Sequence, residues 1–264
     1  SGFGLRDSFN FDDWQFFQAE GLRREWGAAL ECLVRGHSAQ GDLEAAVESD
    51  PTLATAYSVL SHLFYNRSDN VSVVLMARRA YEEDAYLRDA DRILERLFWA
   101  HYDLEQFRDA RTWCDEGGQR FPDNHAFVEC RLWLLVSSSE GSDVDRAWEF
   151  QQQLTDLAPE TQREYEEKLG YLLVGGVLRK AGLADSAAAN LARGKGNEEI
   201  DPWQELLMYE GAIRATTGDP DGAILALRQF LAANPQQSFD LDAGLHWWWR
   251  GLTAREDFRA LTRQ

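Results

Sequence analysis

Proline and alanine recur along this chain with the same period, and that period constrains the fold more than any other feature. Four prolines each follow an apolar helical pattern, with spacings of 71, 37 and 76 residues: Pro51, Pro122, Pro159 and Pro235. Alanines near the middle of the expected second helices are spaced by 71, 37, 40 and 36 residues: Ala39, Ala110, Ala147, Ala187 and Ala223. Both series predict a repeating unit of about 36–40 residues.

The two residue types have different roles in a helix–turn–helix unit. Alanine lets two helices approach closely, and proline after a helix ends it because proline has no N–H group. The inner turn is expected at AGLAD, Ala181–Asp185, and at TGDPD, Thr217–Asp221, where glycine can end one helix and aspartate can begin the next. In FRDARTWC, Phe107, Ala110 and Cys114 share one helical stripe, which the following FPDN ends.

These features resemble the tetratricopeptide repeat (TPR), a helix–turn–helix unit of about 34 residues. The best match is Gly211–Pro235, where six residues stand at consensus positions: Gly211, Gly218, Ala223, Leu227, Leu231 and Pro235. The second best is Ala19–Pro51, through Trp26, Gly27, Leu30, Ala39, Leu43, Ala46 and Pro51. The resemblance implies an all-α, right-handed solenoid of helical hairpins over most of the chain. The longer spacings leave open a closely related helical solenoid.

We expect about six units, near residues 20–51, 54–85, 91–122, 128–159, 168–199 and 204–235. Residues 1–19 and 236–264 are expected to form an N-terminal cap and a C-terminal capping helix and tail, because terminal repeats expose an apolar face.

The tail contains Trp247, Trp248 and Trp249, which cannot all face one side of a helix. Either one indole contacts solvent or a partner, or the tail wraps the last repeat with one indole partly exposed.

The tail and the segment Asp50–Phe64 also resemble, more weakly, TPR-type regions of bacterial serine/threonine kinases and membrane-anchored transcription regulators. This resemblance implies the sensor or docking part of a larger signalling protein. The chain begins SGFG without methionine, which indicates a processed protein or a fragment. It is expected to be soluble, in the cytoplasm or in an extracytoplasmic compartment.

The net charge of the chain limits the classes of molecule that it can bind. The formal net charge is −18 and the sequence pI is about 4.6. Such a charge repels phosphate groups, so we expect no nucleic-acid partner and no anionic membrane partner. The negative net charge either keeps the protein in solution or indicates a basic protein partner. No apolar run reaches the roughly 18–20 residues of a membrane helix, so membrane insertion is not expected.

No catalytic or metal-binding pattern is present in the sequence. The five histidines have no metal-ligand spacing, and nucleophile-elbow, phosphate-loop and dinucleotide motifs are absent. We therefore expect no enzyme activity, no cofactor and no metal. The three cysteines, Cys32, Cys114 and Cys130, are either buried thiols or include a Cys114–Cys130 bridge, if neighbouring helices bring that pair together.

The first helices of a helical-hairpin solenoid line its concave face, where an extended peptide or partner helix usually binds. Aligning the units by alanine and proline predicts ten partner-binding residues: His62, Tyr65, Asn66, Arg92, Glu95, Arg96, Trp99, Tyr102, Trp133 and Arg179. The aromatic residues would bury apolar side chains of the partner, and the arginines would pair with its carboxylates. Alternatively, Trp99 and Trp133 belong to the core between repeats.

The predicted function is a non-enzymatic protein–protein interaction module that binds a protein or peptide partner. Two alternatives use the same scaffold. One is a receptor for a small molecule or peptide signal, and the other is a homodimeric structural scaffold that associates through the tryptophan-rich tail.

Overall fold

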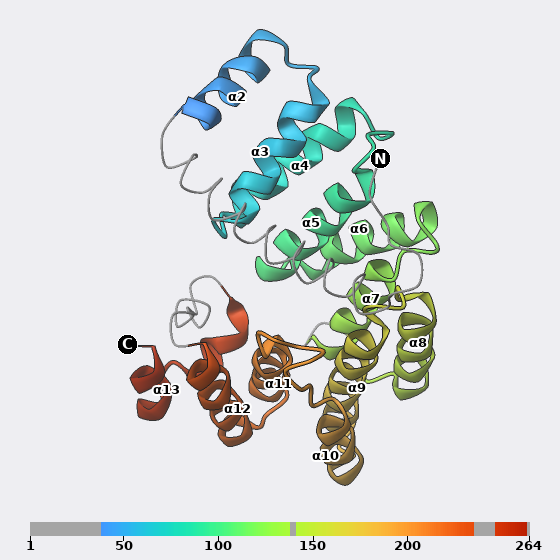
Figure 1. Ribbon diagram of the computed structural model, residues 1–264, viewed down its shortest axis with the longest axis vertical. Helices are drawn as coiled ribbons and strands as arrows, with labels where there is room; N and C mark the ends of the chain where they lie inside the picture. The colour runs from blue at the N-terminus through green and yellow to red at the C-terminus, as the bar shows by residue number, and fades with distance from the viewer. Residues whose placement is uncertain (1–37, 138–140, 235–245, 263–264) are drawn as a thin grey trace, which may run out of the picture. The chain divides into compact units, whose positions relative to one another are not determined.

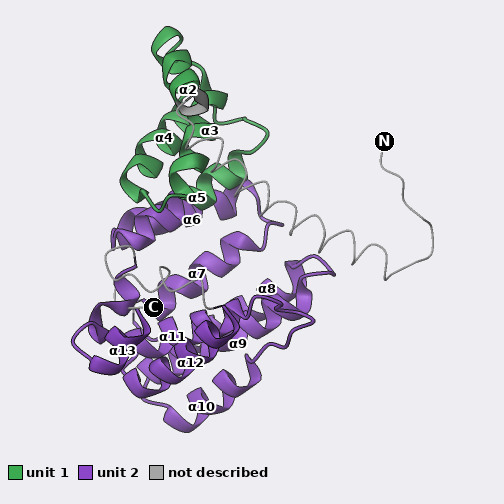
Figure 2. Ribbon diagram, turned by 60° about the vertical axis from the view of Figure 1, so that its left-hand side comes forward, with its two compact units in different colours: residues 1–96 green, residues 97–264 purple. Residues whose placement is uncertain are grey.

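The computed structural model describes residues 38–137, 141–234 and 246–262 of the 264-residue chain. All the regular secondary structure in these ranges is helical (Figure 1). The chain divides into two compact units, Ser1–Arg96 and Leu97–Gln264 (Figure 2). Within the described ranges, no helix combines the length and hydropathy that a membrane crossing requires.

Unit 1 is built around one helical hairpin. Its described helices are α2 (Ser38–Ser49), α3 (Ala54–Tyr65), α4 (Asn70–Glu83) and the first part of α5 (Ala90–Asp103). Helices α3 and α4 pack along each other, and α2 contacts α3. The apolar part of the interior contains small and aliphatic side chains: Ala56, Leu60, Val73, Ala77 and Ala80. Asp69 caps α4, because its carboxylate accepts a hydrogen bond from the Ser72 N–H at 3.1 Å.

Unit 2 contains the rest of α5 and a succession of hairpins. Its further helices are α6 (Phe107–Arg120), α7 (Ala126–Val136), α8 (Val144–Leu157), α9 (Arg163–Lys180), α10 (Ala184–Arg193), α11 (Glu205–Thr216), α12 (Pro220–Ala233), the 3₁₀ helix η2 (Trp247–Leu252) and α13 (Glu256–Leu261). Each second helix packs on the first helix before it, in the pairs α7–α8, α9–α10 and α11–α12. The first helices α7, α9 and α11 also pack in succession. This is the stacking of a helical-hairpin solenoid.

Four of the five alanines that marked the period lie where the helices of a hairpin meet. These four, each on a second helix, are fully buried: Ala110, Ala147, Ala187 and Ala223. The first helices approach closely at Gly176 of α9. A Cβ atom there would lie 2.8 Å from Ile213 of α11 and 3.2 Å from Val136 of α7. The apolar run Leu169–Leu178 therefore belongs to a helix that packs against neighbouring helices.

The four hairpin turns described in full share one backbone feature. In each, the second residue before the second helix has a positive φ: Ser68 (56°), Glu105 (58°), Gly182 (78°) and Gly218 (84°). Glycine adopts this left-handed conformation freely, whereas other residues do so at a cost. The sequence predicted the two glycine turns, and it missed the turns that carry serine and glutamate. Asp219 caps α12 as expected, by accepting from the Gly222 N–H at 3.1 Å.

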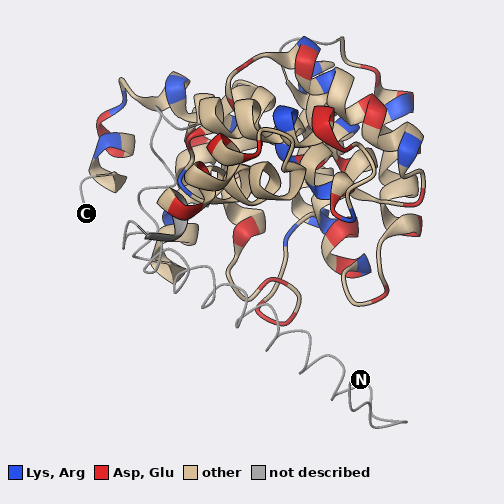
Figure 3. Cartoon of the chain, turned by 90° about the horizontal axis from the view of Figure 1, so that it is seen from above, with Lys and Arg blue, Asp and Glu red and all other residues tan. Residues whose placement is uncertain are grey.

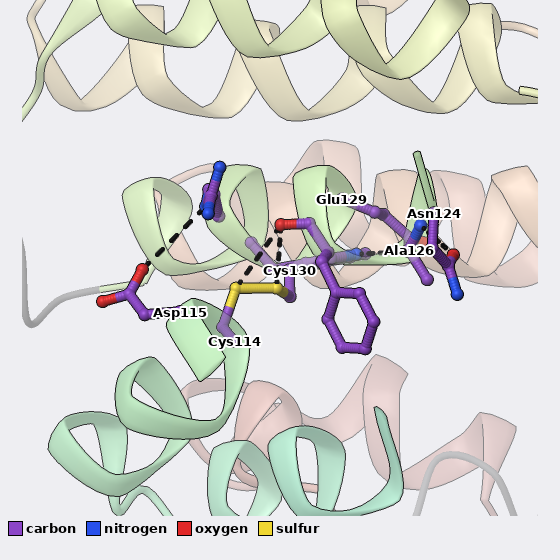
Figure 4. The surroundings of a disulfide bond; sticks show 9 residues. Cys114, Asp115, Asn124, Ala126, Glu129 and Cys130 are labelled. Carbon is purple, nitrogen blue, oxygen red and sulfur yellow. Dashed lines mark hydrogen bonds and ion pairs between the residues drawn. A yellow bond between two sulfur atoms is a disulfide. The ribbon is translucent and has the colours of Figure 1, made fainter. Parts of the chain in front are cut away.

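A disulfide joins Cys114 of α6 to Cys130 of α7 (Figure 4). Their Cα atoms are 6.1 Å apart, and both side chains are buried. Between the cysteines, the Phe127 ring packs directly over Gly117, where a Cβ atom would lie 2.0 Å from the ring. Of the two alternatives that the sequence left open for this pair, the structure contains the bridge. Cys32 lies outside the described residues.

Parts of the expected organisation fall outside the described residues. These are the N-terminal cap at residues 1–19, the first part of the unit near residues 20–51, residues 138–140 of the fourth unit, Pro235, and residues 236–245 of the C-terminal capping helix and tail. The six-unit division therefore remains our proposal. The described part of the tail packs on unit 2, with η2 against α11 and α13 against α12.

Candidate functional site

The ten residues predicted to bind a partner lie on first helices or directly after one, and the boundary between the units divides them. Unit 1 contains His62, Tyr65, Asn66, Arg92, Glu95 and Arg96. Unit 2 contains Trp99, Tyr102, Trp133 and Arg179. Each unit therefore presents its own candidate surface.

The unit 1 surface consists of the last turn of α3 and the first turns of α5. His62, Tyr65 and Asn66 are exposed around the end of α3, and the His62 Nε2 and Asn66 Nδ2 atoms are 3.5 Å apart. Arg92 is exposed on α5, and Glu95 is half-buried. These side chains can offer hydrogen bonds and one aromatic face.

Local electrostatics keep His62 from acting as a cation at neutral pH. Desolvation of the ring lowers the pKa of His62, and the neighbouring charges of Arg96 and Arg92 lower it further, while Asp89 opposes them. Since an ordinary histidine already titrates below pH 7, the imidazole is neutral there. His62 therefore contributes a neutral donor or acceptor to this surface.

Arg96 differs from the expectation of a partner contact, because it is buried inside unit 1. Its Nε atom donates to Ser61 Oγ and its Nη2 atom to Ser58 Oγ, both at 3.1 Å. Ser58 Oγ in turn donates to Asp89 Oδ2 at 2.6 Å, and that carboxylate oxygen lies 3.9 Å from Arg96 Nη2. Arg96 thus joins α3 to α5. In the sequence, this role is indicated only by Ser58 and Ser61 on α3, the first helix of the preceding hairpin.

Arg179 is also engaged within its own unit. Its guanidinium donates to the carbonyl oxygens of Thr217 at 3.2 Å and Gly218 at 3.3 Å, and it lies 3.7 Å from the Asp219 carboxylate. These groups form the turn between α11 and α12. Arg179 therefore links the turn between α11 and α12 to the end of α9 by hydrogen bonds.

The aromatic residues of unit 2 form one cluster. Trp99 lies edge-on to Trp133 and to Tyr102, with ring centroids 5.8 Å apart in both pairs. Tyr102 and Trp133 are each 1% exposed, and the Tyr102 hydroxyl donates to the Trp133 carbonyl at 3.2 Å. These two side chains are thus core, which differs from the expectation of direct partner contact and agrees with the alternative for Trp133. Trp99 is half-buried.

The aromatic cluster also holds part of the tail, which sequence reasoning did not place there. The Trp248 ring stacks on Trp133 at 5.6 Å, with only 7° between the ring planes. Trp247 packs against Phe107 at 5.5 Å and Tyr102 at 5.8 Å. We call the surface formed by Trp99, Tyr102, Phe107, Trp133 and the acidic pair Asp103 and Glu105 the aromatic–acidic surface.

Two polar contacts with acidic residues flank the docked indoles, and the one made by Arg250 is an ion pair. His246 Nδ1 lies 3.4 Å from Asp103 Oδ1, and Arg250 Nη2 lies 2.7 Å from Glu105 Oε1. Basic residues of the tail therefore face acidic residues at the end of α5 and in the turn that follows. Over the rest of the described chain, acidic and basic residues are interspersed on the helices (Figure 3).

The 3₁₀ geometry of η2 explains how three consecutive tryptophans are accommodated. With three residues per turn, successive side chains point about 120° apart. Trp247 and Trp248 face the aromatic cluster, whereas Trp249 is fully buried and lies 6.4 Å from Phe258 of α13. Trp247 is the partly exposed indole. Of the two alternatives for the tail, the structure agrees with packing on the last repeat, because η2 contacts α11 and α13 contacts α12. The indoles of Trp247 and Trp248 also reach α5, α6 and α7 of earlier hairpins.

The docked indoles have unused hydrogen-bonding capacity. The Nε1 atom of Trp247 is buried and has no acceptor in the part of the chain that the structure describes. The Nε1 atom of Trp248 is also buried, and it faces the Tyr102 hydroxyl without a well-aligned hydrogen bond. A buried donor without a well-placed acceptor is unfavourable. The tail is therefore an incompletely matched occupant of this surface.

A cavity of about 370 Å³ lies in unit 2 beside the loop between α10 and α11. Its polar lining includes Lys195, Asn197, Asp201, Gln204 and Glu210. Asp201 accepts from the N–H groups of Glu205 and Leu206, both at 2.9 Å, so it caps α11. Over the described ranges, His, Cys, Asp and Glu form no group of three with metal-binding geometry.

Comparisons with known proteins identify the fold. No protein-family model and no curated protein matches the sequence. Among solved structures, the chain is similar to a thermophilic TPR protein from Thermus thermophilus, with 15% identity and a TM-score of 0.53. The similarity covers 75% of this chain and 98% of that one. The chain therefore has a TPR-like helical-hairpin fold, as predicted.

Proposed function

We propose that this chain is a non-enzymatic protein-interaction module that binds a protein or peptide partner on the first helices of its hairpins. The fold supports the class, because TPR-like solenoids generally serve as protein-binding scaffolds. One observation carries the proposal furthest: the aromatic–acidic surface accommodates a short peptide segment, residues 246–250, which the chain itself supplies.

The chemistry of this surface suits protein recognition. Tryptophan and tyrosine bury a large apolar area and are enriched at binding hot spots, where truncation of one side chain costs roughly 2 kcal/mol or more. The buried Tyr102 and Trp133 form a rigid base, and the half-buried Trp99 and Phe107 complete it. Such a base needs little reordering when a partner binds.

Unit 1 offers a second, more polar contact surface. His62, Tyr65, Asn66 and Arg92 keep exposed side chains there. Arg92 replaces Arg96 and Arg179 as the residue that would pair with a partner's carboxylate, because those two are engaged within their own units. The proposed role as a sensor or docking part of a bacterial regulator follows only from the weaker sequence resemblance.

A small-molecule receptor is the second candidate, and the cavity beside the loop between α10 and α11 favours it. Native mass spectrometry of the purified protein would detect a retained small ligand. The homodimer alternative relied on an exposed tryptophan patch, and Trp248 and Trp249 are instead buried in unit 2.

Affinity capture with matched variants tests the proposed function. Wild type, Trp99→Ala and Trp148→Ala would be immobilised, and proteins retained from the source organism's lysate would be quantified by mass spectrometry. Trp99 and Trp148 are both half-buried, but Trp148 lies on the second helix α8. We expect Trp99→Ala to lose a protein that the other two retain. Identical capture by all three folded proteins would refute binding at this surface.

A further inference from the structure

We infer that the partner presents two adjacent aromatic side chains beside a basic residue, and that it binds by displacing the side chains of His246, Trp247, Trp248 and Arg250 from the aromatic–acidic surface. This inference rests on the proposed function and specifies the partner of the same surface. The docked tail shows which chemistry the surface accepts, because each of its contacts identifies a complementary group.

The slot over Trp133 accepts a flat ring. Trp248 stacks there on two rings, with its centroid 5.6 Å from that of Trp133 and 5.2 Å from that of His246, and both pairs are nearly parallel. Stacking of this kind adds to the stabilisation from area burial. A partner therefore needs an aromatic residue at this position, preferably one as large as an indole.

The neighbouring slot accepts a second ring in a different orientation. Trp247 lies edge-on to Phe107, at an interplanar angle of 83°, and is tilted by 60° against Tyr102. Two rings that follow directly in sequence meet these two orientations when the peptide makes a 3₁₀ turn. This requirement favours adjacent aromatic residues over an isolated one.

The acidic residues determine the charge of the partner. Glu105 pairs with Arg250 at 2.7 Å, and Asp103 faces His246 at 3.4 Å. Glu105 also holds the left-handed turn position that Gly182 and Gly218 occupy in other hairpins. A glutamate tolerated at a position that favours glycine is consistent with a binding role for its carboxylate.

The tail is suited to displacement. The Arg250 side chain is 62% exposed and the Glu105 side chain 39%, so their ion pair is weak. The two indole N–H groups lack well-aligned acceptors among the described residues, and a partner that supplied carbonyl or carboxylate acceptors would bind better. Trp249 and Leu252 are buried in the same short helix, and their burial opposes complete release of η2.

A peptide that copies the tail provides the test. The probe is fluorescein-labelled HWWWRGLT-amide, the sequence of residues 246–253, titrated into full-length proteins and followed by fluorescence anisotropy. Trp248→Ala empties the slot over Trp133, and Trp148→Ala, at a half-buried position on α8, controls for the loss of an indole elsewhere. We expect Trp248→Ala to bind the probe about tenfold more tightly than wild type or Trp148→Ala. The reason is that the Trp133 ring, no longer covered by Trp248, can stack on a tryptophan of the probe.

A charge exchange tests the acidic element separately. Adding Glu105→Arg to Trp248→Ala should weaken binding of the probe about fivefold, and a probe with glutamate in place of its arginine should recover that loss. Because Trp248 is buried, Arg250→Glu serves as a second tail variant that alters only an exposed side chain. It should raise probe affinity about threefold over wild type.

The outcomes separate this inference from the proposed function. Equal probe binding by Trp248→Ala and Trp148→Ala, or no effect of the charge exchange, would overturn the inference. A captured protein that depends on Trp99, together with no probe binding to either tail variant, would overturn the inference and leave the proposed function in place. If no captured protein depends on Trp99 and no tail variant binds the probe, both the inference and the proposed function are overturned.

Discussion

At the scale of single residues, two neighbouring glycines of α6 show how packing determines what a position tolerates. A Cβ atom on Gly117 would lie 2.0 Å from the Phe127 ring, which is buried beside the disulfide. A Cβ atom on Gly118 would meet only the end of the Arg131 side chain, at 2.3 Å from Nη2, and that flexible group can move. The same chemical change should therefore have opposite effects.

We expect Gly117→Ala to lower the free energy of unfolding by about 1–3 kcal/mol, because the core is overpacked. Gly118→Ala should be neutral or stabilising by up to about 1 kcal/mol, because alanine is the better helix former. Urea unfolding followed by circular dichroism measures both. Equal effects of the two substitutions would show that the Phe127 ring does not pack on Gly117.

Asp219 gives a prediction about pH. Desolvation raises its pKa, but the Gly222 N–H, Arg214 and Arg179 together lower the pKa below its ordinary value of 3.8. A carboxylate with a lowered pKa in the folded state adds stability above its ordinary pKa, and that stability is lost as the pH falls through the folded value.

Asp219→Asn keeps the helix cap but removes the charge. We expect the variant to be less stable than wild type by about 1–2 kcal/mol at pH 7, since hydrogen bonds to charged groups are the stronger ones. The difference should shrink steadily below about pH 4. Thermal unfolding of both proteins across the acid range measures it, and a difference independent of pH would contradict the proposed role of the carboxylate.

Sequence reasoning at this scale succeeded for residues with a local role and failed for those with a distant partner. Ala110 and Gly218 have roles set by their own hairpin, so their type and spacing revealed them. Arg96 looked like a partner contact because nothing local indicates Ser58 and Ser61, which lie more than 30 residues earlier. Whether an arginine is exposed depends on such contacts, and periodicity does not encode them.

At the scale of elements, the disulfide joins helices of successive hairpins. It closes a loop with a sequence separation of 16 residues between α6 and α7, the helix that carries Trp133. A loop of this length is expected to add about 3 kcal/mol, chiefly by restricting the unfolded chain. The bridge therefore supports the helix beneath the aromatic–acidic surface.

Replacement of Cys114 and Cys130 together by serine should lower the free energy of unfolding by about 3 kcal/mol. A reducing agent should destabilise wild type by a similar amount and leave the double variant unchanged. Denaturant titrations with and without dithiothreitol measure this. Equal stability of oxidised wild type and the variant would show that the bridge does not contribute.

The docking of η2 was beyond sequence reasoning. His246 and Asp103 are 143 positions apart, and no spacing rule connects them. The sequence did indicate that three consecutive indoles need more than one environment, and the 3₁₀ helix provides two. The missing information was which surface would receive them, because several first helices carry aromatic residues.

At the scale of the whole molecule, the sequence predicted the fold class because the same residue pattern recurs in several units. Five of the six expected units carry an alanine at the helix contact and four carry a proline after the second helix, so weak single matches reinforce one another. A binding surface has no such redundancy, because it occurs once. The aromatic–acidic surface could therefore be assembled only from three-dimensional contacts among α5, α6, α7 and η2.

The central claim is that the partner and the tail use one surface, and site-specific crosslinking tests it most directly. A photoreactive benzoylphenylalanine would replace Phe107, which contacts Trp247 at 5.5 Å. Crosslinked peptides would be mapped by mass spectrometry as the HWWWRGLT probe is added. We predict crosslinks to residues 246–252 without the probe, and their replacement by crosslinks to the probe as its concentration rises. Crosslinks to the tail that persist unchanged at saturating probe would contradict the claim.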